Sequence, residues 1–460
     1  MSIHHIDDLP APPARFPLGH LKTLRQSDMR RQLLEWSKQY RGLYKIRVMH
    51  EALVVIGRGT LIQEVLRQHP GAFRRRSTMQ SVFQELGINS LLSAEGQQQR
   101  MLFNPAFSGE HLRAFFPSMS RVTRQLLNKA GHIAQSGNPV DGRWLFTQYT
   151  VDMLSNLVFG YDTNTLSGNN DVLRGHLAAL FPGLNTRVTS AFPYWHWYKT
   201  SKDKKLEQAL NTVHVFLEQR ITEVKKQVFD QPTLRKKPEN LLQALVVAQE
   251  ENSDAFSDSS VISNAAAILV AGEDTTSSLL SWLAYLLALH PDIQSAVQEE
   301  LLGLPDASLQ QWPLPQTPLL TASIYESMQL KPAPPFIFAE ALQDCAVGDL
   351  FVPKSTRLVM LSNAMSPDEG HFPEPEVFNP YRWLENRWLE KDKCTDSQVM
   401  PFAIGLGASP DLSLALPEIT LSMGRLLEKY TISVTDAEPV RERCDFLMPD
   451  NFSISLTPLI

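Results

Sequence analysis

The chain has 460 residues, of which 43% are hydrophobic and 20% charged, and its formal net charge is −6. This is the composition of a globular protein, and the slight acidic excess argues against a nucleic-acid partner, which would call for a basic surface. The apolar runs are shorter than the ~20 residues of a membrane span, and three scattered cysteines without metal spacing suit a reducing cytoplasm, so we expect a cytoplasmic protein with no metal site and no transmembrane segment.

Hydrophobic periodicity predicts a mainly α-helical protein with a minor β-sheet. No linker divides the chain, so we expect a single domain covering residues 1–460. Residues 29–41 are expected to be helical, and apolar residues recur at helical spacing over 121–159 and 205–226. β-branched residues predict a strand pair over 48–56.

A long helix is expected over residues 261–289, ended by His290 and Pro291. Because this helix is apolar nearly all round, it should be buried. After a proline-rich loop at 303–318, the pattern predicts a helix and several short strands, at 320–330, 336–339, 350–352, 358–361 and in the tail from residue 430.

Within the long helix stands the run Ala271-Gly272-Glu273-Asp274-Thr275-Thr276. Two carboxyls midway along an apolar helix are unusual, because buried carboxylates are rare unless they are paired or functional. The alternative is that the threonines simply bend a buried helix. We take three residues as candidate catalytic groups, namely Asp274, Thr275 and Glu273, and three as candidate substrate contacts, namely Ala271, Gly272 and Phe336.

A glycine-rich segment near the C-terminus, Met400–Leu416, resembles the haem-binding loop of the cytochrome P450 family, Phe-x-x-Gly-x-Arg-x-Cys-x-Gly. Phe402 and Gly405 match this pattern. The position of the family's ligand cysteine holds Ser409, and the position of its arginine holds Gly407. The long-helix motif is similar to the family's Ala-Gly-x-Asp/Glu-Thr-Thr, whose acid and threonine relay protons. The resemblance extends over nearly the whole chain and implies a P450-like fold.

At other positions of the family's motifs, this chain also has a different residue. Glu326 matches the family's Glu-x-x-Arg helix, but its arginine is replaced by Gln329. Arg382 and Trp383 match the Phe-x-Pro-Glu-Arg-Trp motif, and we expect Glu326 and Arg382 to form a buried charge-assisted bond. Ala339 stands where the family places an arginine against a haem propionate. These losses cluster around one cofactor.

A thiolate binds haem iron and favours O–O cleavage, whereas an alcohol, with a far higher pKa than a thiol, does neither well. We therefore expect no cofactor, with haem as the alternative. Three functions remain open. The first is a haem-independent acid–base enzyme of specialised metabolism, a lyase or isomerase that cyclises, dehydrates or isomerises a small hydrophobic molecule. The second is a non-catalytic activator of a biosynthetic enzyme partner, for example a glycosyltransferase. The third is a haem-dependent monooxygenase with an aberrant axial ligand.

The segment Phe192–Tyr198 is dense in aromatic residues. In the family this region covers the substrate channel. The aromatic side chains are expected either to pack as core or lid, or to contact a membrane surface or a partner.

Overall fold

The structure is a computed structural model of the chain. It describes residues 4–14, 17–26, 29–69, 71–75, 81–82, 85–86, 108–168, 180, 183–184, 186–187, 190, 193–251, 256–362, 374–386, 389, 412–435, 441–443 and 448–459. The chain divides into two compact units, which we call the sheet unit (residues 1–77, 318–409 and 442–448) and the helical unit (78–317, 410–441 and 449–460). The expectation of one domain stays a prediction.

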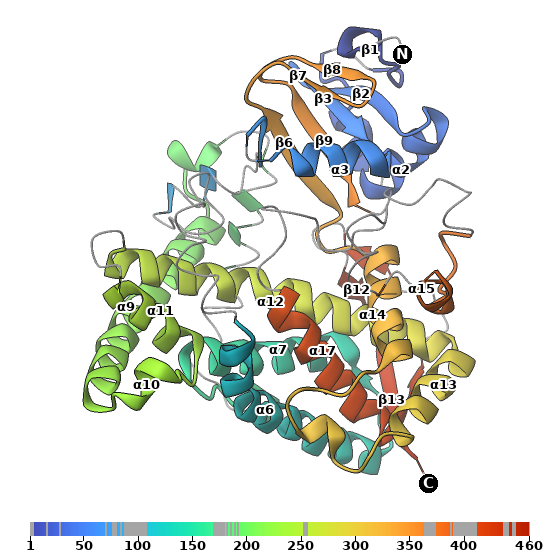
Figure 1. Ribbon diagram of the computed structural model, residues 1–460. Coiled ribbons are helices and arrows are strands. Elements are labelled where there is room, and N and C mark those ends of the chain that lie inside the picture. The colour runs from blue at the N-terminus through green and yellow to red at the C-terminus, as the bar shows by residue number, and fades with distance from the viewer. Residues whose placement is uncertain are drawn as a thin grey trace. The chain divides into compact units, whose positions relative to one another are not determined.

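The sheet unit is organised around a five-stranded sheet with strand order β2-β3-β9-β6-β4 (Figure 1). Strands β2 and β3 form an antiparallel hairpin, and β3 runs parallel to β9. The strands of this unit are β1 (His4–His5), β2 (Leu43–Val48), β3 (Glu51–Ile56), β4 (Phe73–Arg75), β6 (Phe336–Ala341), β7 (Cys345–Val347), β8 (Leu350–Val352) and β9 (Arg357–Leu361). Its helices are α1 (Leu21–Gln26), α2 (Met29–Gln39), α3 (Gly59–Arg67), α14 (Pro318–Leu330) and α15 (Tyr381–Glu385).

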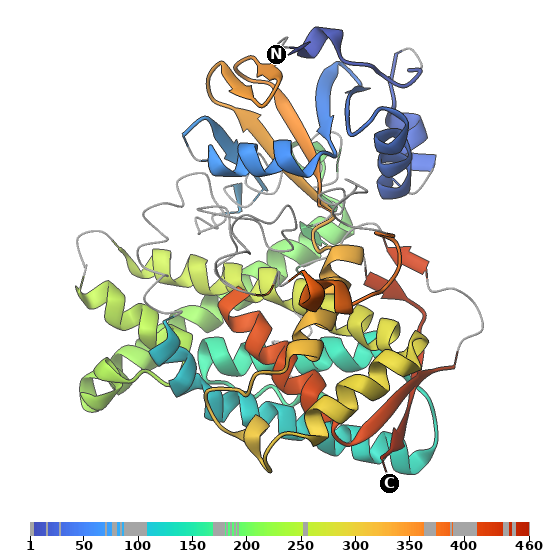
Figure 2. The same ribbon diagram turned by 45° about the vertical axis from the view of Figure 1, so that its right-hand side comes forward.

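The helical unit is built around α12, which packs against α7, α9, α11, α13 and α17. Its helices are α6 (Gly109–Ser136), α7 (Gly142–Phe159), α9 (Ser201–Asp230), α10 (Thr233–Lys236), α11 (Leu241–Glu251), α12 (Asp258–Leu289), α13 (Pro291–Leu302) and α17 (Leu412–Leu427). Its small sheet has the order β10-β13-β5, from β5 (Val140–Asp141), β10 (Tyr430–Val434) and β13 (Ser453–Pro458). The C-terminal strands are drawn in red in Figure 2. Two short strands, β11 (Arg441–Arg443) and β12 (Met448–Asp450), form a separate two-stranded sheet whose residues are divided between the two units.

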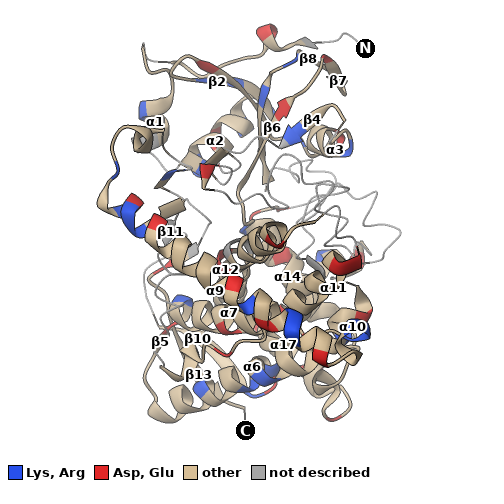
Figure 3. Cartoon of the chain, turned by 90° about the vertical axis from the view of Figure 1, so that its left-hand side faces the viewer, with Lys and Arg blue, Asp and Glu red and all other residues tan. Residues whose placement is uncertain are grey.

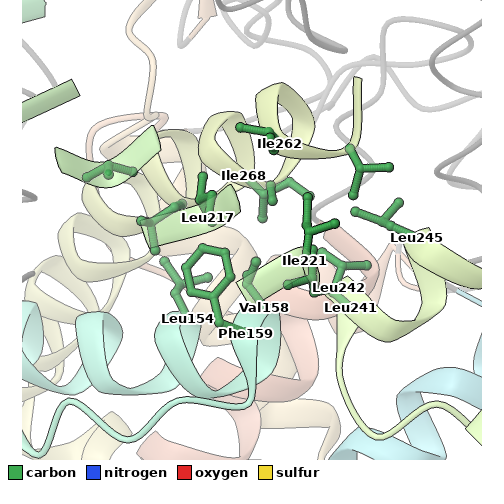
Figure 4. Packing of buried hydrophobic residues seen from close by; sticks show 14 of the residues in the cluster. Leu154, Val158, Phe159, Leu217, Ile221, Leu241, Leu242, Leu245, Ile262 and Ile268 are labelled. Atoms are coloured by element: carbon green, nitrogen blue, oxygen red, sulfur yellow. The ribbon is translucent and has the colours of Figure 1, made fainter. Parts of the chain in front are cut away.

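A large apolar core joins the helices of this unit. Side chains of α7, α9, α11 and α12 converge in it, as Figure 4 shows. Its members include Leu154, Val158, Phe159, Leu217, Ile221, Leu242, Leu245 and Ile268. The hydrophobic effect, at about 25 cal/mol per Å² of apolar surface buried, is the main stabilising contribution of such a core. The scaffold that carries α12 is therefore held mainly by apolar packing.

The mainly helical class with minor sheets is confirmed, and the long helix predicted at 261–289 is α12. The helical run predicted over 121–159 is wrong as a single element. It is broken between α6 and α7, where Gly137 adopts the left-handed backbone at φ 66° and ends α6. The strand pair predicted at 48–56 starts too late, because β2 begins at Leu43. Among the described residues, no helix is long and apolar enough to cross a bilayer.

Candidate functional site

The candidate acid–base residues lie on α12, and local interactions fix where this helix begins and ends. Ser257 caps its N-terminus, because the Ser257 Oγ accepts a hydrogen bond of 3.3 Å from the backbone N–H of Ser260. The helix ends before Pro291, which starts α13. Most of the side chains between these ends are buried, as the apolar sequence predicts.

Gly272 faces α7 across a close helix contact. A Cβ atom at Gly272 would lie 3.1 Å from both methyl carbons of Leu154 on α7. This contact is tighter than ordinary packing, so a side chain at this position would require Leu154 to move by a few tenths of an ångström. This side of α12 is therefore occupied by protein. A substrate contact from Gly272 stays a prediction, and the side chain of Ala271 lies outside the described residues.

Glu273, Asp274 and Thr275 follow Gly272 as a partly accessible stretch of α12. Successive helical residues are about 100° apart around the axis, so Asp274 lies about 200° from Gly272, on the side away from α7. Thr276, the next residue, is buried again. The three predicted catalytic residues thus combine accessible surface with a position in the middle of a mostly buried helix.

The environment of Glu273 favours the protonated carboxyl. Burial raises the pKa of Glu273 to about 8, and the negative charge of Asp274 adds to the increase. Part of the residue remains accessible, yet enough protein surrounds the carboxyl to disfavour its charged form. At neutral pH Glu273 therefore holds a proton that it can donate.

Buried hydroxyls bond back along the same helix just after this stretch. The Oγ of Ser277 donates to the backbone oxygen of Asp274 at 3.4 Å, and the Oγ of Ser281 donates to that of Ser277 at 2.6 Å. Such bonds satisfy buried hydroxyls and are associated with bent helices. The sequence allows the threonines of the motif to bend α12. Ser277 and Ser281 make bonds of the kind associated with such a bend.

In the sheet unit, the carboxyl of Glu326 on α14 is fully buried. Its Oε2 accepts a hydrogen bond of 2.6 Å from the Nε1 of Trp383, and its Oε1 accepts one of 3.0 Å from the backbone N–H of Asn379. The Nε of Arg382 lies 3.3 Å from Oε1. The predicted bond between Glu326 and Arg382 is confirmed. Burial still raises the pKa of Glu326 above its usual value, although these three partners lower it.

Three other residues that the sequence singled out lie in the core of the sheet unit. Gln329 is buried on α14, one turn after Glu326. Ala339 is buried on β6, where its Cα pairs with that of Leu358 on β9. Phe336, at the start of β6, packs in a buried apolar cluster. Its role as a substrate contact stays a prediction.

Sequence reasoning missed the buried carboxyl of Glu418 on α17. The side chain is buried, and its Oε1 has no hydrogen-bond partner among the described residues. Burial raises the pKa of Glu418 to about 8. The side chain of Tyr149 on α7 is also buried. Burial raises the pKa of its hydroxyl, and the charge of Glu418 raises it further. The hydroxyl shares a hydrogen bond of 3.2 Å with Thr123 of α6. An acidic residue in the apolar sequence of α17 was the available signal.

The remaining predicted positions, Ser409 and Gly407, lie outside the described residues. Their identities and the buried neutral side chains of Gln329 and Ala339 bear on how haem would fit. The resemblance aligns a hydroxyl, an amide and a methyl group of this chain with a thiolate and two guanidinium groups of the family. Neutral groups bind an anionic porphyrin less strongly than cations do. Among the described residues, no group of three or more His, Cys, Asp or Glu side chains is arranged to hold a metal ion.

In sequence and in fold, the chain is similar to proteins named cytochrome P450. The chain is 24% identical over 423 residues to cytochrome P450 3A6 of Oryctolagus cuniculus, covering 87% of this chain and 81% of the relative. It is 26% identical over 433 residues to cytochrome P450 27C1 of Danio rerio, covering 87% and 77%. A solved structure described as "Crystal structure of cytochrome P450DA heme domain" matches with a TM-score of 0.82 at 18% identity, covering 100% of this chain and 99% of that one. The predicted P450-like fold is confirmed.

These findings also correct the cofactor expectation. A family model described as Cytochrome P450 matches residues 10–454, and proteins of that family carry haem. The expectation that no cofactor binds is therefore wrong, because different residues at the single positions Ser409, Gln329 and Ala339 do not outweigh a family match over residues 10–454. From residue 10 to residue 454, the chain belongs to the cytochrome P450 family.

Proposed function

We propose that this cytochrome P450-family protein binds a small hydrophobic molecule of specialised metabolism and transfers protons to and from it with Glu273, Asp274 and Thr275. The observation that carries the proposal is the pKa of Glu273, which burial and the Asp274 charge raise to about 8. A general acid works best when its pKa lies near the working pH. Where one of two neighbouring carboxyls is held protonated, it can serve as the acid and the other as the base.

Each residue has a distinct part in this proposal. Glu273 holds a proton on its carboxyl at neutral pH and donates it to the bound molecule. Asp274, which lies away from α7, accepts a proton as the carboxylate. The hydroxyl of Thr275, the next residue on α12, is a donor and an acceptor and passes a proton between solvent and the carboxyls.

Haem, when bound, supplies the oxidative chemistry of the family. The donor set at Ser409, Gln329 and Ala339 fits haem less well than the family's residues, so no step of this proposal runs through it. A cytoplasmic location remains a prediction from the cysteine content of the sequence.

The test uses Glu273→Gln and Asp274→Asn, with Glu299→Gln on the exposed face of α13 as the matched control. Small apolar molecules extracted from the purified protein provide the substrates, and turnover is followed by mass spectrometry. Haem content, read from the absorption spectrum, is measured for every variant, so a loss of cofactor is not mistaken for a loss of proton transfer. We expect turnover to fall about 100-fold or more in both α12 variants at unchanged haem content.

Unchanged turnover in both α12 variants would contradict the proposal. If the wild-type protein also turned nothing over alone, but raised the activity of a co-purifying biosynthetic enzyme, the activator function would replace it.

A further inference from the structure

The outward face of α9 carries a line of exposed side chains at a regular spacing. Val215, Thr222 and Phe229 follow one another at intervals of seven residues, and each is exposed. Residues seven apart lie within about 20° of each other around a helix, so the three form one line, which we call the α9 stripe. Val215 is 43% exposed and Phe229 is 78% exposed. Single exposed apolar residues are ordinary, but a seven-residue spacing along one helix is the spacing at which a second helix packs.

The opposite face of α9 is already buried within the helical unit. Its apolar side chains belong to the core that α9 shares with α7, α11 and α12, and they include Leu206, Val213, Leu217, Ile221, Val224 and Val228. A capping box fixes the first turn, where the Oγ1 of Thr200 accepts from the backbone N–H of Asp203 at 3.3 Å. The α9 stripe is therefore presented by a rigid helix, which lowers the conformational entropy lost on binding.

Thr222, in the middle of the α9 stripe, can be buried at small cost. Its Oγ1 donates to the backbone oxygen of Glu218 at 3.0 Å. The hydroxyl group is thus satisfied within α9. A hydroxyl that depended on water for its hydrogen bond would oppose burial at an interface, whereas this one does not. The middle of the stripe is therefore compatible with apolar packing.

The residues around Thr222 are self-complementary. Glu218 lies four residues before Thr222 and Lys226 lies four residues after it. When a second α9 packs antiparallel with Thr222 on the two-fold axis, Glu218 of each copy comes level with Lys226 of the other. The same arrangement brings Val215 of each copy level with Phe229 of the other. A parallel pair would instead place each of these charges level with its own copy, where like charges repel.

Neighbouring charges on α9 have partners within the chain. The Nζ of Lys225 lies 2.5 Å from the Oδ1 of Asp258, and Arg220 pairs with Glu223. Lys226 is then the lysine of this pair that faces an acidic group of a second copy. Figure 3 shows acidic and basic residues mixed along the helices of this unit, so two copies approach without facing a surface of a single charge.

We propose that two copies of the chain form an antiparallel dimer through the α9 stripe, with Thr222 on the two-fold axis. A two-fold dimer uses the same surface of both copies, so that surface must be complementary to itself, as the α9 stripe is. One valine and one phenylalanine from each copy bury a small apolar area, so the dimer is weak and depends on concentration. The proposal is independent of the acid–base chemistry of α12.

Sedimentation of the full chain in the analytical ultracentrifuge, at concentrations from about 5 to about 500 µM, tests the association. We expect monomer at the low end of this range and a growing share of dimer at the high end. Phe229→Ala should weaken the dimer at least tenfold. Leu302→Ala is the matched control, because it removes an apolar side chain that is 64% exposed on α13. Monomer at every concentration, or equal losses in the variant and the control, overturns the proposal.

Exchanged charges test the antiparallel arrangement. Glu218→Lys brings a lysine level with Lys226 of the second copy, and Lys226→Glu brings a glutamate level with Glu218. Each variant alone should therefore dimerise at least fivefold more weakly than the wild type. In an equal mixture of the two variants every such pair again has opposite charges, so we expect a mixed dimer of about wild-type strength. Glu299→Lys, at an exposed position of α13, should change the association less than twofold. A mixture that associates no more strongly than its components overturns the proposal.

Discussion

The Nε1 of Trp383 donates a hydrogen bond of 2.6 Å to the Oε2 of Glu326, joining α15 to a fully buried carboxyl on α14. The other carboxylate oxygen is shared between the backbone N–H of Asn379 and the Nε of Arg382. Each oxygen of Glu326 therefore has a donor. A buried carboxyl costs little only while its oxygens are satisfied, so this network depends on the indole as much as on the guanidinium group.

Replacing Trp383 by phenylalanine keeps an aromatic ring but removes this donor. We expect Trp383→Phe to lower the free energy of unfolding by about 1–3 kcal/mol, the cost of leaving a buried acceptor unsatisfied. Urea unfolding followed by circular dichroism measures the change. Trp197→Phe is the matched control, because Trp197 is exposed and its replacement should alter stability by less than about 0.5 kcal/mol. Similar losses in both variants would show that the bond contributes nothing.

Burial of Glu418 makes stability depend on pH. Its pKa is raised from 4.5 to about 8, so between these values the folded protein keeps a proton that the unfolded chain has lost. The free energy of unfolding therefore falls as pH rises through this window, by about 1.4 kcal/mol per pH unit for one proton. Glu418→Gln should reduce this slope by one proton. Urea midpoints between pH 5 and 8 measure it.

Glu273 contributes a second proton with the same sign, so part of the slope remains in Glu418→Gln and the slope falls further when Glu273→Gln is added. The raised pKa values of Glu326 and Glu428 keep a contribution of the same sign in the double variant. A wild-type stability that is flat or rises with pH over this range would contradict the assignment.

Gly272→Ala tests the contact between α12 and α7. Alanine favours a helix over glycine by about 1 kcal/mol, but here its Cβ would lie 3.1 Å from both methyl carbons of Leu154. Overpacking costs about 1–3 kcal/mol, so we expect a net loss of stability. In a Leu154→Ala background the same change should become stabilising. Gly131→Ala in α6 is the control, because its Cβ would meet the Tyr430 hydroxyl at an ordinary 3.4 Å. A stabilising Gly272→Ala in the wild-type background would refute the close packing.

The raised pKa of Glu273 also predicts the shape of the activity profile. If Glu273 donates a proton, turnover is constant below pH 7 and falls as pH rises through about 8, where the carboxyl loses its proton. Glu273→Gln cannot donate a proton, so its residual turnover should lack this fall. Initial rates between pH 6 and 9.5 give the profile. An identical alkaline fall in wild type and variant would assign the titration to another group.

The long elements were predictable because their patterns are repeated over many residues. The apolar run at 261–289 predicted a buried helix, which is α12, and the short strand predicted at 350–352 is β8. The run over 121–159 was misread because periodicity continues across the break at Gly137. There, a single residue with positive φ outweighs the pattern on either side.

The candidate site was predictable where a polar residue interrupts an apolar pattern, as Glu273 and Asp274 do. The bond from Trp383 to Glu326 was not, because the two residues lie 57 positions apart and the register of their helices decides the contact. Glu418 was missed for a related reason. The sequence shows only that the residues around Glu418 on α17 are mostly apolar. The burial of its carboxyl comes from other elements that pack on α17.

The pairing of β13 with β5 and β10 has a consequence for biosynthesis. Ile454 pairs with Val140 on one side and Val434 on the other, and Phe452 occupies the space beside Gly142 at the start of α7. The start of α7 thus remains uncovered until residues 452–458 have left the ribosome. Helices made some 300 residues earlier need this strand for their final packing, so truncation just before Phe452 would leave the core of the helical unit unfinished.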